Sequence, residues 1–220
     1  MKQLLQGILN ISTFIVIAYT SYLLILLSLP YIHFERDVEF LETKQLIYHI
    51  KPWKHSFYIH VFFSPVVIIS GLFQFNRWLI TNQPKVHRIF GYIYIITVLL
   101  ISAPSALVMS FYANGGRVAQ ISFVTLTLCW ILFTWIAFQR AKKGNYPSHV
   151  KWTLRSYALT LSAVTLRFYA YLFDVFNVDL PPRETYILVS YLSWIPNLLF
   201  VQLLIRLKYV KYLLLKTKHS

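Results

Sequence analysis

Long apolar stretches alternate with short polar connections along the whole chain. The stretches cover residues 8–29, 55–76, 89–116, 118–139, 152–176 and 185–205, and only the fifth contains Asp, Glu, Lys or Arg. A transmembrane helix needs about 20 apolar residues to cross the hydrocarbon core of a bilayer. The pattern therefore predicts an all-α integral membrane bundle of about six transmembrane helices, folded as a single domain over residues 1–220.

Basic residues gather in every second connection. They lie between residues 77 and 88, between 140 and 151, and in the tail from 206 to 218, whereas the intervening connections are mixed or nearly neutral. Cytoplasmic loops carry an excess of Lys and Arg. A topology with six spans and both termini in the cytoplasm places every basic connection on the cytoplasmic side. The first stretch is longer than a typical signal peptide and no A-x-A site follows it, so we expect an uncleaved helix.

The composition fits a membrane protein better than a soluble or nucleic-acid-binding one. Of the 220 residues, 57% are hydrophobic and only 13% are charged, while the net charge is +14 at pH 7. A soluble chain needs more polar residues to cover its surface. Since the basic residues are divided among short connections, we expect the lipid bilayer, and no nucleic acid, as the partner. The expected location is a cell membrane, specifically the bacterial inner membrane.

Two features concern the shape of the helices and their connections. Pro65, Pro104 and Pro196 fall inside predicted helices, where neighbouring groups must satisfy the carbonyls that proline leaves free. The connection over residues 31–54 is the longest, and it has room for an interfacial helix.

The fifth stretch carries a polar stripe along one face of its helix. The members follow one another at intervals of seven, four, three and four residues: His149, Ser156, Thr160, Ala163 and Arg167. Asp174 continues this stripe, and Arg155 lies on a neighbouring face. Ionisable residues inside a membrane are costly and usually face the bundle interior or a cavity. The stripe therefore predicts the side of this helix that faces the other helices.

A first polar cluster is predicted at the cytoplasmic ends of the helices. His87 and His149 each begin a helix that runs outward, and Gln74 and Arg155 are expected at a similar level. Two histidines from different helices can supply both axial ligands of a haem iron, and an arginine can pair with the haem propionates. The cluster therefore suggests a haem b between His87 and His149, with these two as the metal ligands.

A second polar cluster is predicted deeper in the membrane, towards the outer face. His60 and Arg167 are expected at a similar depth there, with Asp174 beyond them. His60 and Arg167 are candidate cofactor-binding residues, because they would line a pocket suited to a quinone headgroup.

Each of these residues also has a purely structural interpretation. His87 and His149 can be solvated histidines at the membrane interface, and His60 can be bonded to a backbone carbonyl. Arg167 and Asp174 can form an ion pair across seven residues.

The sequence lacks the motifs of several other functions. Cys129 is the only cysteine, so the chain has no CxxC metal site and no CxxCH haem attachment. There is no Glu-x-x-His pair for a di-iron site, no glycine-rich phosphate loop and no G-x-S-x-G nucleophile elbow. Five of the six spans contain no carboxylate, whereas proton pumps and cation transporters normally need one at depth.

An ordered set of segments lies within the middle of the chain: His60 with SGLFQF at 70–75, HRIFGYIY at 87–94, HVKWTLRSYALT at 149–160, and Leu166 with Arg167. Together they resemble an uncharacterised bacterial family of predicted membrane proteins called DUF2306. The resemblance covers about residues 55–173 and leaves out the first and last helices; Thr153 stands where we expect a Met. This family has no established activity, so the resemblance implies a fold and site positions more than a function.

A weaker likeness is to cytochrome b561-type and ferric-reductase membrane domains, which bind haem between paired histidines on adjacent helices. Here His87 and His149 could form one such pair. The fourth helix has no histidine to face His60, so one haem or none fits better than two.

The functional hypotheses leave open whether the chain is an enzyme. The first is a redox protein with a b-type haem at His87 and His149 and a quinone or another membrane redox partner. The alternative is a non-enzymatic transporter or membrane assembly subunit, in which the polar stripes serve packing. A third is an enzyme that uses a divalent metal held by His87, His149 and a further ligand, which the scarcity of acidic residues disfavours.

Overall fold

The computed structural model describes residues 15–207 and 209–214, and this part of the chain contains helices and no strand. Five segments are long and apolar enough to cross a membrane: Ile15–His33, Lys51–Phe75, Pro84–Ser110, Arg117–Lys142 and Pro182–Arg206. Tyr146–Thr160 and Ser162–Val175, bent by 40° at a break, provide a sixth if they act as one span. The predicted all-α bundle of about six spans is therefore confirmed. Residues 8–14 of the first predicted span and 215–220 of the basic tail lie outside the described residues.

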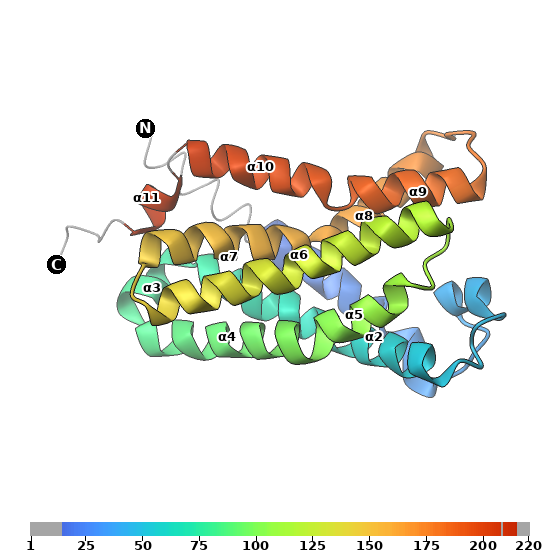
Figure 1. Cartoon of the computed structure of the whole chain (residues 1–220), viewed down its shortest axis with the longest axis horizontal. Helices are drawn as coiled ribbons and strands as arrows, with labels where there is room; N and C mark the ends of the chain where they lie inside the picture. The colour runs from blue at the N-terminus through green and yellow to red at the C-terminus, as the bar shows by residue number, and fades with distance from the viewer. Residues whose placement is uncertain (1–14, 208, 215–220) are drawn as a thin grey trace.

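The spans lie side by side, and successive spans run in opposite directions (Figure 1). Their helices are α2 (Lys51–Leu72), η3 (Phe73–Phe75), α3 (Arg77–Asn82), α4 (Pro84–Ile96), the π-helix η4 (Thr97–Ser102), α5 (Ala103–Ser110), α6 (Arg117–Lys142), α7 (Tyr146–Thr160), α8 (Ser162–Val175), α9 (Pro182–Leu192), α10 (Ile195–Arg206) and α11 (Tyr209–Leu214). Local chemistry sets the boundaries, because Asn76 and Asn145 cap the starts of α3 and α7 through their side chains. The short connections then place sequential spans next to each other.

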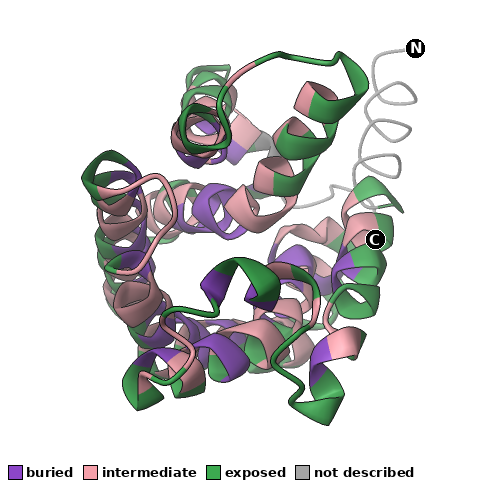
Figure 2. Cartoon of the chain, turned by 90° about the vertical axis from the view of Figure 1, so that its right-hand side faces the viewer, coloured by how far each residue is buried: buried purple, intermediate pink, exposed green. Residues whose placement is uncertain are grey.

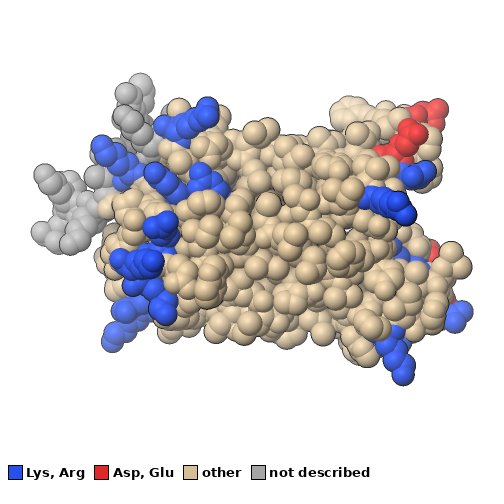
Figure 3. All heavy atoms as spheres, viewed as in Figure 1, with Lys and Arg blue, Asp and Glu red and all other residues tan. Residues whose placement is uncertain are grey.

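Lys and Arg side chains gather at one end of the bundle, which we call the basic end (Figure 3). The connections from α2 to α4 and from α6 to α7 form this end. The other end, called the opposite end, carries Asp179 and Glu184 in the connection to α9 and its first turn. The alternation of basic connections with mixed or nearly neutral ones along the sequence thus produces a charge difference between the two ends of the bundle. That the basic end faces the cytoplasm stays a prediction.

Large apolar side chains are exposed in the middle of the spans. Leu100 is 72% exposed and Leu199 is 67% exposed. Seen from the opposite end, buried residues lie on faces turned towards neighbouring helices and exposed residues lie mainly on the outside (Figure 2). A soluble surface rarely exposes so much apolar area, whereas lipid solvates it.

Three spans are interrupted within their length. The π-helix η4 separates α4 from α5 just before Pro104. Leu161 separates α7 from α8, and the step from Ser193 to Trp194 separates α9 from α10 shortly before Pro196. Interruptions inside a membrane are tolerated only where the freed backbone groups find other partners.

Two of these interruptions are joined by hydrogen bonds. The Asn197 side chain donates to the Ala158 carbonyl at 3.1 Å and lies 3.0 Å from the Thr165 hydroxyl oxygen. The Thr165 hydroxyl in turn donates to the Ser193 carbonyl at 2.5 Å. The break in the α7–α8 span and the break in the α9–α10 span are therefore joined through the backbone carbonyls of Ala158 and Ser193.

A buried network of polar side chains connects α4, α6 and α7. The Tyr94 hydroxyl lies 2.7 Å from Ser156 Oγ and 2.8 Å from Thr160 Oγ1. Thr134 Oγ1 lies 2.6 Å from Ser156 Oγ, and the Trp130 indole donates to Thr160 Oγ1 at 3.0 Å. Two members of the predicted stripe, Ser156 and Thr160, thus face the bundle interior, where hydrogen bonds between helices add to packing.

The connection before α2 folds into two short 3-10 helices, η1 (Leu29–His33) and η2 (Glu39–Lys44), rather than one interfacial helix. Its buried Leu41 packs with Trp53 and Phe57 at the start of α2. The segment therefore covers the opposite end of the bundle around the first turns of α2.

Candidate functional site at the basic end

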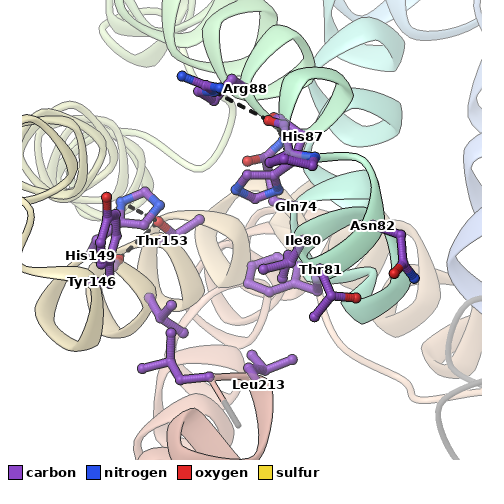
Figure 4. A pocket seen from close by; sticks show the side chains of 14 residues that line it. Gln74, Ile80, Thr81, Asn82, His87, Arg88, Tyr146, His149, Thr153 and Leu213 are labelled. Atoms are coloured by element: carbon purple, nitrogen blue, oxygen red, sulfur yellow. Dashed lines mark hydrogen bonds between the residues drawn. The ribbon is translucent and has the colours of Figure 1, made fainter. Parts of the chain in front are cut away.

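Two adjoining cavities open at the basic end between α4 and α7. The larger has a volume of about 720 Å³ and the smaller about 320 Å³. Gln74, His87, Arg88, Tyr146, His149 and Thr153 line both cavities. Leu213 of α11 lies on the far side of the larger one, below the two histidines in Figure 4. The two histidines that the sequence predicts to meet therefore share one site.

His149 is held in a defined orientation by α6 and its own helix. Its Nδ1 lies 2.9 Å from the Ala137 carbonyl oxygen, which can only accept a hydrogen bond. Nδ1 must therefore carry the proton, and the lone pair of Nε2 is left free. Thr153, one turn along α7, lines the cavity beside it and donates its hydroxyl to the His149 carbonyl at 2.9 Å. This tautomer is the one that a metal-binding histidine needs.

His87 enters the same cavity from the first turn of α4. Its Nδ1 is buried and has no hydrogen-bond partner among the described residues. A buried nitrogen without a hydrogen-bond partner is costly, so the inaccessible Nδ1 of His87 is an unfavourable feature of this site. The two imidazoles face each other across the space between the helices (Figure 4).

Cationic side chains lie around the cavities. Arg88 lines both cavities and donates Nε to the Pro84 carbonyl at 3.3 Å, while Lys142 lines the smaller cavity. Both residues are exposed, so their charges lie at the mouth and not in the interior. They can meet a negatively charged group on a bound molecule.

Arg155, expected beside these histidines, faces α10 instead. Its guanidinium donates to Gln202 Oε1 at 2.9 Å and lies 4.7 Å from the centre of the Trp152 ring. It lines neither cavity. Arg155 lies six residues after His149, and six residues of helix turn the side chain by about 600°, well away from the face of His149.

No hydrogen bond or ion pair joins the described members of the second predicted cluster. Arg167 of α8 bonds to the Ala163 carbonyl of its own helix and shares no hydrogen bond with His60 of α2. His60 Nδ1 lies 3.1 Å from the Ser102 carbonyl, as its structural interpretation expects. The alternative, structural interpretation of Arg167 and Asp174 as an ion pair is wrong, because the salt bridge found among the described residues joins Arg36 to Asp37. Seven residues of helix rise by about 10 Å, which is too far for that contact.

Within residues 15–207 and 209–214, no group of three or more His, Cys, Asp or Glu side chains could hold a metal ion. The hypothesis of a divalent metal with His87, His149 and a third ligand of these types is therefore not supported there. A porphyrin differs, because it supplies four nitrogens itself and needs only two axial ligands.

The sequence model of one family matches most of the chain. Its description is "Predicted membrane protein (DUF2306)", and it matches residues 57–205. The chain belongs to the DUF2306 family. Neither a curated protein nor a solved structure gives a significant match. The family match extends through the last span, so the expectation that the last helix carries no part of the resemblance is wrong. The weaker likeness to cytochrome b561-type domains is not shown.

In this DUF2306 chain, three residues of the shared lining were not predicted from the sequence: Arg88, Tyr146 and Thr153. A simple signal could have identified Thr153, since it lies four residues after His149 and thus on the same helical face. Tyr146 lies three residues before His149 and thus on this face too, whereas Arg88 directly follows His87. The position of Arg88 could not be inferred without the angle at which α4 and α7 approach each other.

Proposed function

We propose that this multi-pass membrane protein is a redox protein that binds one b-type haem between His87 and His149. One observation carries the proposal: the two histidines come from different helices and face one cavity at the basic end. Haem would supply one-electron redox chemistry, while the protein would supply the axial ligands and the surrounding charges.

The dimensions and chemistry of the cavity support this proposal. Small-molecule and cofactor sites usually measure about 300–1,000 Å³, and the larger cavity alone has about 720 Å³. Phe75 and Leu213 give it apolar surface for a macrocycle, and Arg88 and Lys142 offer cations to the propionates. The bond from His149 to Ala137 fixes one imidazole with Nε2 free.

The location of this site suggests the class of redox partner. A cofactor at the end of a membrane bundle can exchange electrons with a lipid-soluble quinone or with another membrane redox protein. We propose one of these two as the partner, in the bacterial inner membrane.

The test is the absorption spectrum of detergent-purified protein from cells with ample haem, first oxidised and then reduced by dithionite. A Soret band with sharp reduced α and β bands is expected from two imidazole ligands. His87→Ala and His149→Ala should each lose at least about 90% of bound haem, because either change removes an axial ligand. His55→Ala is the matched control, because His55 is exposed near the start of α2.

Two results would reject the proposal: a colourless wild-type protein, or undiminished haem content in both cavity variants. A colourless protein would favour the second candidate, a non-enzymatic transporter. The three interrupted spans favour that candidate, because transporters commonly bind substrates where membrane helices are discontinuous.

A further inference from the structure

The smaller cavity reaches the side of the bundle between α4 and α6, whereas the larger one lies beside α3 and α11 at the basic end. Tyr92 of α4 lines the smaller cavity and not the larger one. Tyr92 also belongs to an exposed apolar face of α4, which it shares with Ile89, Ile93 and Ile96 at helical intervals. In a membrane such a face is covered by lipid. The smaller cavity therefore reaches the lipid-facing surface at Tyr92.

The facing edge of α6 has the same character. Trp135 and Lys142 are seven residues apart and both exposed, so they share one face of α6. Between them Phe138 lines the cavity, and its ring centre lies 6.0 Å from that of Trp135 and 6.4 Å from that of Tyr92. Lys142 Nζ lies 5.5 Å from the centre of the Phe138 ring. Aromatic rings and a lysine thus frame a lateral entrance, as they do at membrane interfaces.

The interior of this cavity suits a small headgroup. Thr134, at its inner end, lies eight residues before Lys142 and hence about 12 Å further into the bundle. The volume of about 320 Å³ is at the lower end of the range for small-molecule sites. A single ring can therefore enter, while an attached hydrocarbon tail stays in the lipid.

The hydroxyl groups at the inner end are already saturated with hydrogen bonds. Thr134 donates to the Trp130 carbonyl at 2.7 Å, so the Ser156 hydroxyl must donate to Thr134. The Tyr94 hydroxyl must then donate to Ser156 and accept from Thr160. Each hydroxyl hydrogen of this network has an acceptor within the protein, so the inner wall has no donor left for a ligand.

Gln74 and Tyr146 are the cavity side chains with unused hydrogen-bonding capacity. Gln74 is only 7% exposed, and its Nε2 donates to the His87 carbonyl at a long 3.4 Å. Its second N–H and its Oε1 have no hydrogen-bond partner among the described residues, nor has the Tyr146 hydroxyl. An amide and a phenol can each donate and accept. This pair can therefore bind a carbonyl group of a ligand as well as a hydroxyl group.

We propose that the smaller cavity binds the headgroup of a lipid-soluble quinone, in its oxidised or reduced form. Gln74 and Tyr146 bond to the ring oxygens, Tyr92 and Phe138 contact the ring, and the tail leaves between α4 and α6. The role of this molecule rests on the proposed function, because the quinone would lie beside the His87–His149 pair as its redox partner. Binding itself does not require the haem.

The charge distribution favours a quinone over an anionic phospholipid. Arg88 and Lys142 are exposed at the mouth, whereas Gln74, Tyr94 and Thr134 further in are uncharged. A phosphate group would remain at the mouth, because moving a charge inside without a partner is costly. A neutral ring with two oxygens can occupy the interior.

The test is photolabelling of the detergent-purified full chain with a radiolabelled azido-quinone. We expect saturable labelling that a decyl-substituted benzoquinone displaces and decylbenzene, which lacks the carbonyls, does not. Gly91→Leu should reduce the affinity at least about tenfold, because Gly91 lines only the smaller cavity and the new side chain fills it. Gln74→Leu should weaken binding about three- to tenfold through lost hydrogen bonds. Gln139→Leu, at a residue that lines neither cavity, should leave it unchanged.

Equal labelling of wild type and Gly91→Leu would overturn the proposal, as would equal displacement by decylbenzene. Displacement by phosphatidylglycerol and not by the quinone would also overturn it, and would assign the cavity to a phospholipid. If Gly91→Leu does not fold, Ala141→Phe narrows the same cavity and serves for the comparison.

The haem spectrum of the same samples separates this proposal from the proposed function. Specific labelling of a colourless protein would support the quinone site and reject the haem. A haem spectrum without specific labelling would reject the quinone site alone, and would leave a membrane redox protein as the partner.

Discussion

At the scale of single residues, Lys44 is a buried cation that joins two distant segments. Its Nζ donates to the Tyr112 carbonyl at 2.5 Å and to Asn114 Oδ1 at 2.6 Å, and the residue is only 4% exposed. These contacts fasten the segment before α2 to the connection between α5 and α6. Burial lowers the pKa of Lys44 from its ordinary value of 10.5 to about 8.

The lowered pKa of Lys44 predicts a specific pH dependence of stability. Between about pH 8 and 10.5 the unfolded state binds a proton that the folded state has lost, so stability should rise with pH across this window. The gain should be on the order of 1–3 kcal/mol and should be absent in Lys44→Met. Thermal unfolding in detergent between pH 7 and 11 measures it, with Lys51→Met, at an exposed lysine, as the control. Identical slopes for wild type and Lys44→Met would contradict the prediction.

Helical geometry was enough to predict which face of a helix a residue occupies. It was not enough to predict the partners of that residue on other helices. The face of α7 was predictable, because Ser156 and Thr160 follow the helical period and are both buried. Their partners Tyr94, Thr134 and Trp130 come from two other helices, so the hydrogen bonds were not predictable. The orientation of Arg155 was not predictable for the same reason, because its hydrogen-bond partner Gln202 belongs to another helix, α10.

At the scale of helices, close packing at Gly71 joins α2 to α4 and α7. A Cβ at this position would overlap the Tyr157 ring and lie 2.9 Å from Tyr94 Cε2. Tyr157 also donates its hydroxyl to the Ile68 carbonyl at 3.1 Å, so its ring cannot move away without loss. Helix contacts in membranes often rely on such small residues.

Gly71→Ala should therefore destabilise the bundle by about 1–3 kcal/mol, since the added methyl forces two buried rings apart. The matched control is Gly91→Ala, where the new Cβ meets only the flexible amide of Gln74 at 3.1 Å. Thermal unfolding of both variants in the same detergent measures the difference. A Gly71→Ala protein at least as stable as Gly91→Ala would show that the three helices are packed less closely than described.

The number of spans could be predicted, whereas their interruptions could be predicted only in part. Proline removes a backbone donor, and Pro104 and Pro196 do lie beside two of the interruptions, whereas Pro65, marked in the same way, lies inside the continuous helix α2. The break at Leu161 follows neither proline nor glycine. It depends on Asn197 and Thr165, which satisfy the backbone there through contacts between different spans.

At the scale of the whole molecule, charge and cavities divide the bundle into two ends. The basic end carries the His87–His149 cavity, and the acidic residues Asp179 and Glu184 lie at the opposite end. The order of basic connections along the chain was enough to predict this charge division. The cavity depends on how α3, α4, α7 and α11 close around it, which no periodic pattern encodes.

The orientation of the bundle predicts which ends a membrane-impermeant maleimide can reach. In a background where Cys129 is replaced by Ala, Lys143→Cys at the basic end should be labelled only from the cytoplasmic side. Asp179→Cys, after α8, should be labelled only from the other side, because the bent pair α7–α8 lies between the two positions. The Cys-free chain is the control.

The two labelling results separate two different errors. Labelling of Lys143→Cys from outside would reverse the orientation, and it would turn the positive residues of the basic end away from the cytoplasm. Labelling of both positions from the same side would mean that α7 and α8 enter and leave the membrane on one face. The bundle would then have five spans, Arg167 would lie on a re-entrant segment, and the two termini would lie on opposite faces.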